Sequence, residues 1–248
     1  MSRENASTDA QTTPTTASAD LTNAEAVRLL QGADSGVRPQ SGRLAYRFVK
    51  RTFDIVFSAG VCVVLFIPGA ILAGAICIDS PGGPMFRQVR IGKGGKEIRI
   101  WKFRSMYVDA HGHPERYLSE EQLAQWQREQ KVDDDPRVTR VGRFIRKTSL
   151  DEIPQFINVL VGDMSIIGPR PVTLAETYEF GENRDEALSV RPGITGWWQV
   201  TDRNDATWEN GRRQERELEY VRNRGFAMDA RCFFSTFGVM FGKDRSGR

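Results

Sequence analysis

One uninterrupted apolar run, from Ile55 to Ile78, constrains the fold of this chain more than any other feature. It contains no charged residue, and at about 1.5 Å per residue a helix over it would be roughly 36 Å long, enough to cross a hydrocarbon core of about 30 Å. Pro68 and Gly69 lie in its middle. Because an interior proline removes a helix hydrogen bond, the sequence predicts a helix kinked at Pro68.

Basic residues lie on both sides of this run. Between Arg38 and Arg104 there are 12 basic and three acidic residues, although the whole chain carries only +3. The positive-inside rule cannot place both flanks in the cytoplasm if the helix spans the membrane. We therefore favour a re-entrant helix with both ends cytoplasmic over a single span or a buried core helix. Lys50 and Arg51 are expected to anchor it at anionic headgroups, with Asp54 pairing with them there.

The remaining chain predicts a tail and one folded domain. Residues 1–40 are polar and too poor in apolar side chains to order themselves, apart from one short helix around Asn23–Leu30. The basic flank and membrane helix would occupy 41–83, the folded domain 84–242 and a basic tail 243–248. The three cysteines lie in apolar stretches, which argues against a disulfide-stapled secreted protein and favours a cytoplasm-facing location.

Local patterns within 84–242 predict an α+β fold. Met85–Ile91 and Lys96–Phe103 alternate around a glycine cluster, as expected of a β-hairpin, and the cluster lacks the spacing of a phosphate-binding P-loop. A polar helix is expected over Glu115–Lys131. The apolar stretch Phe226–Phe241 is too short to span a membrane and indicates an interfacial amphipathic helix. A metal site at His111 and His113, or at the Asp133–Asp135 triplet, is less favoured than an ordinary loop.

Charged residues gather around Ser149–Glu152. This tetrapeptide predicts a capping box that opens a helix, and in the simplest interpretation Asp151 and Glu152 only complement the helix dipole. Adjacent carboxylates beside several guanidinium groups, however, suit a metal-bound polyphosphate. Arg191, in the Gly- and Pro-rich segment Val190–Trp197, is a further phosphate-binding candidate, although that segment serves equally well as a structural turn.

Five segments, taken together, resemble the bacterial sugar transferase family, the monotopic phosphoglycosyl transferases that begin exopolysaccharide and O-antigen assembly. These are Lys50-Arg51 before Pro68, Lys102–Met106, Asp151–Gln155, Gly162–Pro171 and Arg191–Trp197. They occur in order and at the spacing of the family. The resemblance covers roughly Arg47 to Phe241 and leaves the polar tail outside it.

The resemblance implies transfer of a sugar phosphate from a UDP-sugar to undecaprenyl phosphate, with Mg²⁺, through a covalent aspartyl intermediate and with release of UMP. Asp151 would be the nucleophile and Glu152 the metal ligand. The implied phosphate-binding residues are Arg146 and Arg170, with Pro169 and Pro171 beside Arg170, and we add Lys102 and Arg104 from the matching segment. Trp198, Asp202 and Glu217 depart from the family pattern, and these departures bear on which sugar is used.

The implied location is the cytoplasmic face of the bacterial inner membrane. Expected partners are the two substrates, an anionic bilayer and a second copy of the chain. Nucleic acid is not expected, because the positive charge flanks an apolar run and lacks interleaved aromatic residues. The alternative function is a catalytically silent, membrane-tethered scaffold of a polysaccharide assembly complex.

Overall fold

The computed structural model describes residues 44–110, 112–129, 132, 134–202 and 205–241. The expectations for the polar tail, the short helix at Asn23–Leu30, His111 and the 243–248 tail lie outside these residues.

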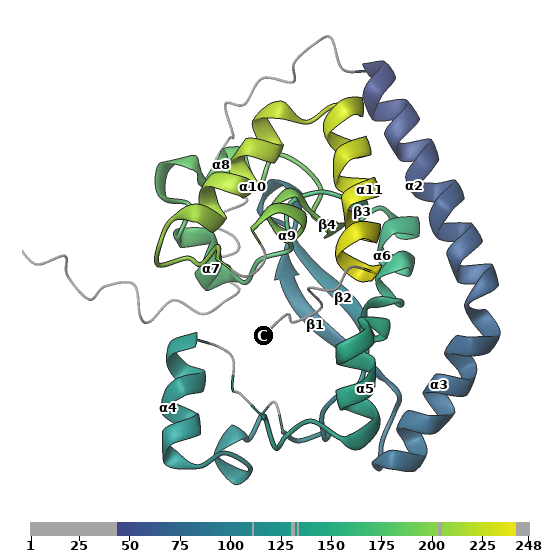
Figure 1. Cartoon of the computed structure of the whole chain (residues 1–248), viewed down its shortest axis with the longest axis vertical. Helices are drawn as coiled ribbons and strands as arrows, with labels where there is room; N and C mark the ends of the chain where they lie inside the picture. The colour runs from purple at the N-terminus through teal and green to yellow at the C-terminus, as the bar shows by residue number, and fades with distance from the viewer. Residues whose placement is uncertain (1–43, 111, 130–131, 133, 203–204, 242–248) are drawn as a thin grey trace, which may run out of the picture.

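Two helices, α2 (Leu44–Val64) and α3 (Phe66–Asp79), form a bent pair along one side of the molecule (Figure 1). They meet at Leu65 with a bend of 60°. Pro68 has no N–H to donate to the carbonyl of Val64, and regular bonding resumes where the Gly69 N–H donates to the Leu65 carbonyl at 2.8 Å. The predicted kink is thus confirmed.

By length and composition, no single helix in the described ranges could cross a membrane, whereas the bent pair together passes that test.

Helix α2 is fixed to the domain by its charged residues. Asp54 is buried, and its Oδ1 accepts hydrogen bonds from Ser165 Oγ at 3.1 Å and from the Ile166 N–H at 3.0 Å. Lys50 Nζ lies 2.8 Å from Asp229 Oδ2, and the Arg51 guanidinium donates to the carbonyls of Val159 and Leu160.

Lys50 and Arg51 thus make their hydrogen bonds with the domain and not with Asp54, while their role as headgroup anchors stays a prediction. The physical reason is that α2 packs against α6 (Gln155–Val161) and, through contacts between aromatic rings, against α11 (Phe226–Phe241). The exposed carbonyls at the end of α6 attract Arg51, and the carboxylate of Asp229 on α11 attracts Lys50.

The predicted hairpin is confirmed. Strands β1 (Met85–Ile91) and β2 (Glu97–Phe103) pair antiparallel, joined through the 3₁₀ turn η1 (Lys93–Gly95). The free edge of β2 faces α6, where the Asn158 side chain accepts from the Trp101 N–H at 2.9 Å and donates to the Arg99 carbonyl at 2.8 Å. Asn158 therefore supplies β2 with the bonds of a missing neighbouring strand.

The helix expected over Glu115–Lys131 begins later than predicted, and its last two residues lie outside the described part of the chain. A 3₁₀ turn, η2 (Pro114–Arg116), comes first, and α4 (Glu120–Glu129) follows it after a break. In Figure 1, α4 lies apart from the other helices.

A second, two-stranded sheet pairs β3 (Ser165–Ile167) in parallel with β4 (Gly193–Thr195). Its backbones approach so closely that a Cβ added at Gly193 would lie 2.1 Å from the Gly168 nitrogen, and one at Gly196 would lie 2.5 Å from the Gly168 carbonyl oxygen. The other elements are α5 (Arg140–Thr148), η3 (Leu150–Glu152), α7 (Leu174–Tyr178), η4 (Gly181–Asn183), α8 (Arg184–Ala187), α9 (Trp197–Thr201) and α10 (Arg212–Asn223).

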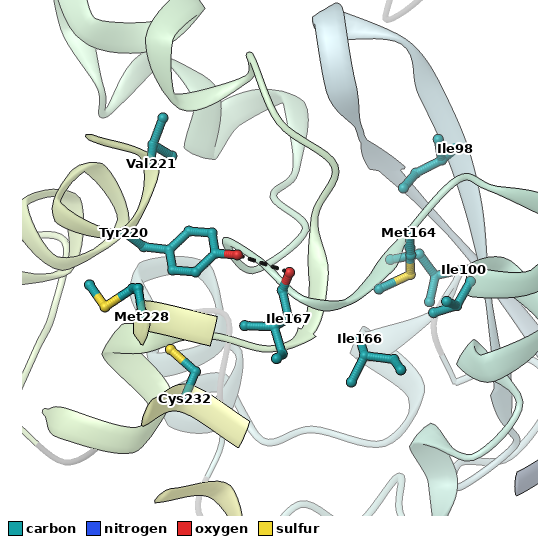
Figure 2. Packing of buried hydrophobic residues seen from close by; sticks show 10 residues of the cluster. Ile98, Ile100, Met164, Ile166, Ile167, Tyr220, Val221, Met228 and Cys232 are labelled. Carbon is teal, nitrogen blue, oxygen red and sulfur yellow. Dashed lines mark hydrogen bonds between the residues drawn. The ribbon is translucent and has the colours of Figure 1, made fainter. Parts of the chain in front are cut away.

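The main core lies between the two sheets and the last two helices. Figure 2 shows Ile98 and Ile100 of β2 near Met164 and Ile166, with Tyr220 of α10 on the other side. The Tyr220 hydroxyl donates to Asp229 Oδ1 at 2.7 Å and also lies 3.2 Å from the Ile167 carbonyl oxygen. Because helices and small sheets share this core, the α+β class is confirmed.

Candidate active site

The Asp151–Glu152 pair sits on a tight turn between two helices. Ser149 ends α5 in the left-handed conformation, with φ 57°, and its N–H donates to the carbonyls of Ile145 and Arg146. The pair lies in η3, and α6 begins only at Gln155. Ser149 makes no capping hydrogen bond with its side chain, so the predicted capping box is wrong: the left-handed residue turns the chain before the next helix starts.

Asp151 is half-buried, and this burial raises its pKa to about 6. The neighbouring Glu152 carboxylate acts in the same direction, while the positive charges of Lys102 and Arg146 lower the pKa. The carboxyl group therefore loses its proton near neutral pH but remains poorly solvated, as suits a nucleophile.

Glu152 and Arg146 each contact a residue on strand β2 or just after it. Lys102 Nζ, on β2, lies 3.3 Å from Glu152 Oε1. Arg146 Nε donates to Ser105 Oγ at 2.8 Å. Four residues predicted from the sequence, Asp151, Glu152, Lys102 and Arg146, are thus brought together.

A cleft of about 330 Å³, open to solvent, lies beside this group. Two residues of the predicted Pro-Arg-Pro segment, Arg170 and Pro171, reach it, whereas Pro169 lines a neighbouring, more apolar hollow. The cleft is lined by Gln88, Arg90, Ile100, Lys102, Glu152, Gln155, Arg170, Pro171, Gly193, Ile194 and Gln199. Arg90, Lys102 and Arg170 give it the positive charge that a phosphate needs.

The Arg170 segment is held in place from α10. Glu217 is fully buried, and its Oε1 accepts the Arg170 N–H at 2.9 Å. Burial raises the pKa of Glu217 to about 8. Arg213, one helical turn earlier, lies over the rings of Trp198 and Trp208 and pairs with Glu176 at 3.3 Å.

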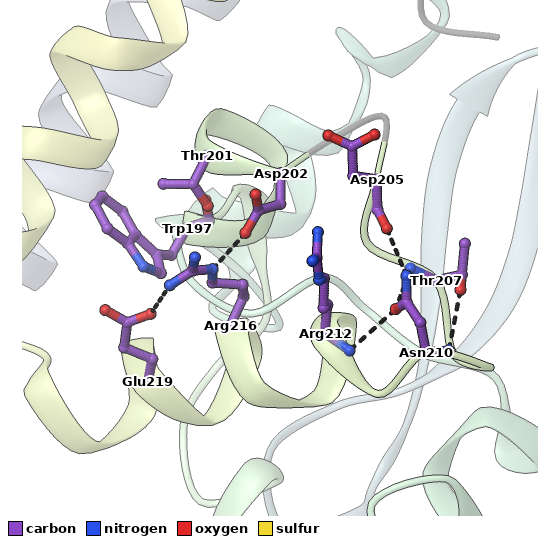
Figure 3. A network of polar contacts seen from close by, with 9 residues as sticks. All are labelled: Trp197, Thr201, Asp202, Asp205, Thr207, Asn210, Arg212, Arg216 and Glu219. Carbon is purple, nitrogen blue, oxygen red and sulfur yellow. Dashed lines mark hydrogen bonds and ion pairs between the residues drawn. The ribbon is translucent and has the colours of Figure 1, made fainter.

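Arg216 of α10 bonds Asp202, at the end of α9, on one side and Glu219, at 2.7 Å, on the other (Figure 3). The Asn210 side chain donates to the Asp205 carbonyl at 2.7 Å and accepts from the backbone N–H groups of Thr207 and Arg212 at 3.1 Å each. Asp202, a departure from the family pattern, therefore positions α9 instead of facing the cleft.

Two phosphate-binding candidates, Arg104 and Arg191, bind backbone carbonyls and do not line the cleft. Arg104 is buried and donates to Ser80, Pro81, Gly82 and Gly83, so it closes the turn between α3 and β1. Arg191 donates from Nε to the Gly162 carbonyl at 2.7 Å and does not line the cleft. In both cases the guanidinium group donates hydrogen bonds to backbone carbonyls that a turn leaves without other partners.

Sequence reasoning missed several residues of the cleft, among them Gln88, Arg90, Gln155 and Gln199. Strand alternation could have placed Gln88 and Arg90 on one face of the hairpin. Gln155 and Gln199 carried no comparable signal, because their position depends on how α6 and α9 meet the hairpin.

Within the described residues there is no cluster of three or more His, Cys, Asp or Glu side chains suited to a metal. Mg²⁺ is commonly held by one or two carboxylates together with substrate phosphates and water. The Asp151–Glu152 pair beside a cationic cleft fits that pattern, with Glu152 as the ligand that would have to exchange its contact with Lys102.

The chain belongs to the bacterial sugar transferase family, whose model matches residues 45–243. Among curated relatives, it is 38% identical over 80% of its length to a UDP-galactose-lipid carrier transferase of Erwinia amylovora. It is likewise 38% identical over 80% of its length to an undecaprenyl-phosphate galactose phosphotransferase of Salmonella typhimurium.

The chain covers 41% of each of these two relatives. It covers 86% of the exopolysaccharide production protein ExoY of Rhizobium meliloti, to which it is 36% identical over 81% of its own length.

Proposed function

We propose that the protein transfers a sugar 1-phosphate from a UDP-sugar to undecaprenyl phosphate. The observation that carries this proposal is the half-buried Asp151, with a pKa of about 6, which interacts with Lys102 and Arg146 and adjoins Glu152. Glu152 and Lys102 line the cationic cleft. The printed names of the relatives, which include an undecaprenyl-phosphate galactose phosphotransferase, support the same reaction class.

The proposed chemistry has two displacements at one phosphorus. A carboxylate oxygen of Asp151 attacks the β-phosphorus of the UDP-sugar, the bond from that phosphorus to the bridging oxygen breaks, and UMP leaves with the bridging oxygen. A phosphate oxygen of undecaprenyl phosphate then attacks the same phosphorus and releases the Asp151 carboxylate. A diphosphate linkage is broken in the first step and formed in the second, so the reaction is nearly balanced in energy.

The other charged residues stabilise phosphate. Lys102, Arg90 and Arg170 supply positive charge where it builds up on phosphate oxygens, and the desolvation of Asp151 keeps its carboxylate reactive. We propose Glu152 as the ligand of Mg²⁺, which supplies charge neutralisation when it is bound to the substrate diphosphate.

The bent helix pair is proposed to lie in the cytoplasmic leaflet of the inner membrane and to return to the same face. Both ends of the pair are bonded to one domain: Lys50 to Asp229 at the start, and Asp79 Oδ2 to the Val141 N–H, at 2.9 Å, at the end. Its outer surface carries exposed Val56, Val63, Val64, Phe66, Ile67 and Ile71, and the helices packed against it add Phe144, Ile157, Val161, Phe234 and Phe237. A bilayer would cover this apolar area.

Product identity tests the proposal. Wild-type protein incubated with a UDP-sugar labelled in the β-phosphate is expected to release UMP and to retain the label before any lipid is added. Asp151→Asn should do neither while still folding, because the amide is not a nucleophile. Release of UDP, or labelling of Asp151→Asn, would contradict the aspartyl route. A protein that folds but turns over no UDP-sugar would favour the scaffold alternative.

A further inference from the structure

Gln199 is the one residue of α9 that lines the cleft. Its side-chain oxygen, Oε1, is buried and has no hydrogen-bond donor among the described residues. Buried acceptors in proteins almost always have a donor, and leaving one without a partner typically costs about 1–3 kcal/mol. Because Gln199 lines the cleft, a ligand bound there can supply the donor that this acceptor lacks.

Other buried polar atoms near Gln199 in the fold also have no hydrogen-bond partner among the residues described. Of the eight buried side-chain polar atoms without a partner in the described parts of the chain, six belong to α9 and α10. They are Trp197 Nε1, Trp198 Nε1, Gln199 Oε1, Arg213 Nε, Gln214 Oε1 and Glu217 Oε2. Unpaired polar atoms are thus concentrated in α9 and in α10, which packs against it, and among these residues Gln199 is the one that lines the cleft.

Contacts at both ends of helix α9 hold the backbone of Gln199 in place. The Gly196 residue before it packs against the Gly168 carbonyl, and the Thr201 hydroxyl and the Asp202 N–H cap its last turn by donating to Trp197 and Trp198 carbonyls. Arg216 holds Asp202 from α10 (Figure 3). An acceptor carried by a helix that is held at both ends suits selection of a ligand by geometry.

We propose that Gln199 is a specificity-determining residue that accepts a hydrogen bond from the sugar of the donor substrate. This inference rests on the proposed function and names the part of the substrate that meets α9. The phosphate oxygens are hydrogen-bond acceptors only, so they cannot donate to Gln199 Oε1. Their partners in the cleft are Lys102, Arg90 and Arg170. The sugar is bonded directly to the phosphate that Asp151 attacks, and its hydroxyl and acetamido groups are donors.

The test compares Gln199→Met with wild type on UDP-glucose, UDP-galactose, UDP-N-acetylglucosamine and UDP-N-acetylgalactosamine. Methionine keeps the length of the side chain and removes the acceptor. We expect kcat/KM for the preferred UDP-sugar to fall about tenfold or more, in line with one lost hydrogen bond. The values for the other sugars should fall less, so the discrimination ratio shrinks, while inhibition by UMP stays unchanged.

Two further variants complete the test. Gln199→Glu keeps an acceptor oxygen, so it should preserve the discrimination ratio even if its charge slows every substrate. Gln122→Met, on α4 and outside the cleft, is the matched control and should behave as wild type.

The opposite results are equally clear. An unchanged discrimination ratio in Gln199→Met would overturn the sugar contact. Equal losses for all four substrates together with weaker inhibition by UMP would also overturn it, and would show that Gln199 contacts the uridine instead. These outcomes require an active wild type, whereas failure of the proposed function would appear as no turnover by wild type with any of the four donors. In that case, an equal thermal stabilisation of wild type and Gln199→Met by each UDP-sugar would also overturn the inference.

Discussion

Asp54 of α2 accepts the N–H of Ile166 at 3.0 Å, across 112 positions of the chain. The same oxygen, Oδ1, accepts the hydroxyl of Ser165 at 3.1 Å. A buried carboxylate in the bent helix pair therefore joins this pair to the small parallel sheet on which the Arg170 segment begins.

Replacing Asp54 by alanine should lower the stability of the domain by roughly 1–3 kcal/mol, because the Ile166 N–H would be buried without an acceptor. Asp54→Asn keeps an oxygen in the same place and should lose much less. Thermal unfolding of the detergent-solubilised variants measures the difference. Equal melting temperatures for Asp54→Ala and wild type would show that this bond does not hold the helix.

The pH dependence of turnover should report Asp151. Because burial raises its pKa to about 6, kcat/KM should rise with pH through about 6 as the carboxylate forms. Lys102 lowers that pKa, so Lys102→Met should move the rise to higher pH, in addition to any loss of rate. The measurement is kcat/KM as a function of pH for wild type and Lys102→Met. An acid limb at the same pH in both proteins would argue against Asp151 as the titrating group.

Glu217 should make stability depend on pH. Its pKa is raised from 4.5 to about 8 by complete burial, so the folded protein holds a proton that the unfolded chain releases. This contribution is fully present below about pH 4.5 and is lost as pH rises towards 8. Denaturant unfolding between pH 5 and 8 should therefore show a steeper loss of stability in wild type than in Glu217→Gln, which keeps the acceptor for the Arg170 N–H. Parallel curves would contradict an uncharged Glu217.

The re-entrant path of the helix pair is testable with cysteines. In a variant without Cys62, Cys77 and Cys232, single cysteines at Ala45 and Lys96 should both resist a membrane-impermeant thiol reagent added to intact spheroplasts. Both should react after lysis, which controls for accessibility. Labelling of either one in intact cells would establish a span. Pro68→Leu should straighten the bend and increase such labelling.

Local signals in the sequence were enough to predict the hairpin, the kink at Pro68 and the pairing of Asp151 and Glu152 with nearby cations. Strand alternation, a missing N–H and a cluster of charge act over a few residues, so they can be read along the chain.

The roles of Arg51, Arg104 and Arg191 could not be predicted in this way. Each of these side chains binds backbone carbonyls of a turn or a helix end that lies elsewhere in the sequence, and a basic residue bound there has the same sequence pattern as one that meets phosphate. The left-handed Ser149 was missed for a related reason. A serine followed by an acid three positions later is typical of a helix start, and only the packing of α5 shows that a helix ends there instead.

The close approach of Gly168, Gly193 and Gly196 limits how this site can change. Since a side chain at any of these positions would strike backbone atoms, the segments that carry Arg170 and Gln199 cannot be shifted independently or lengthened without losing the small sheet. New donor preferences should therefore arise by exchanging side chains on an unchanged backbone. Libraries aimed at altered glycans are best confined to Gln88, Gln155 and Gln199, with the three glycines left untouched.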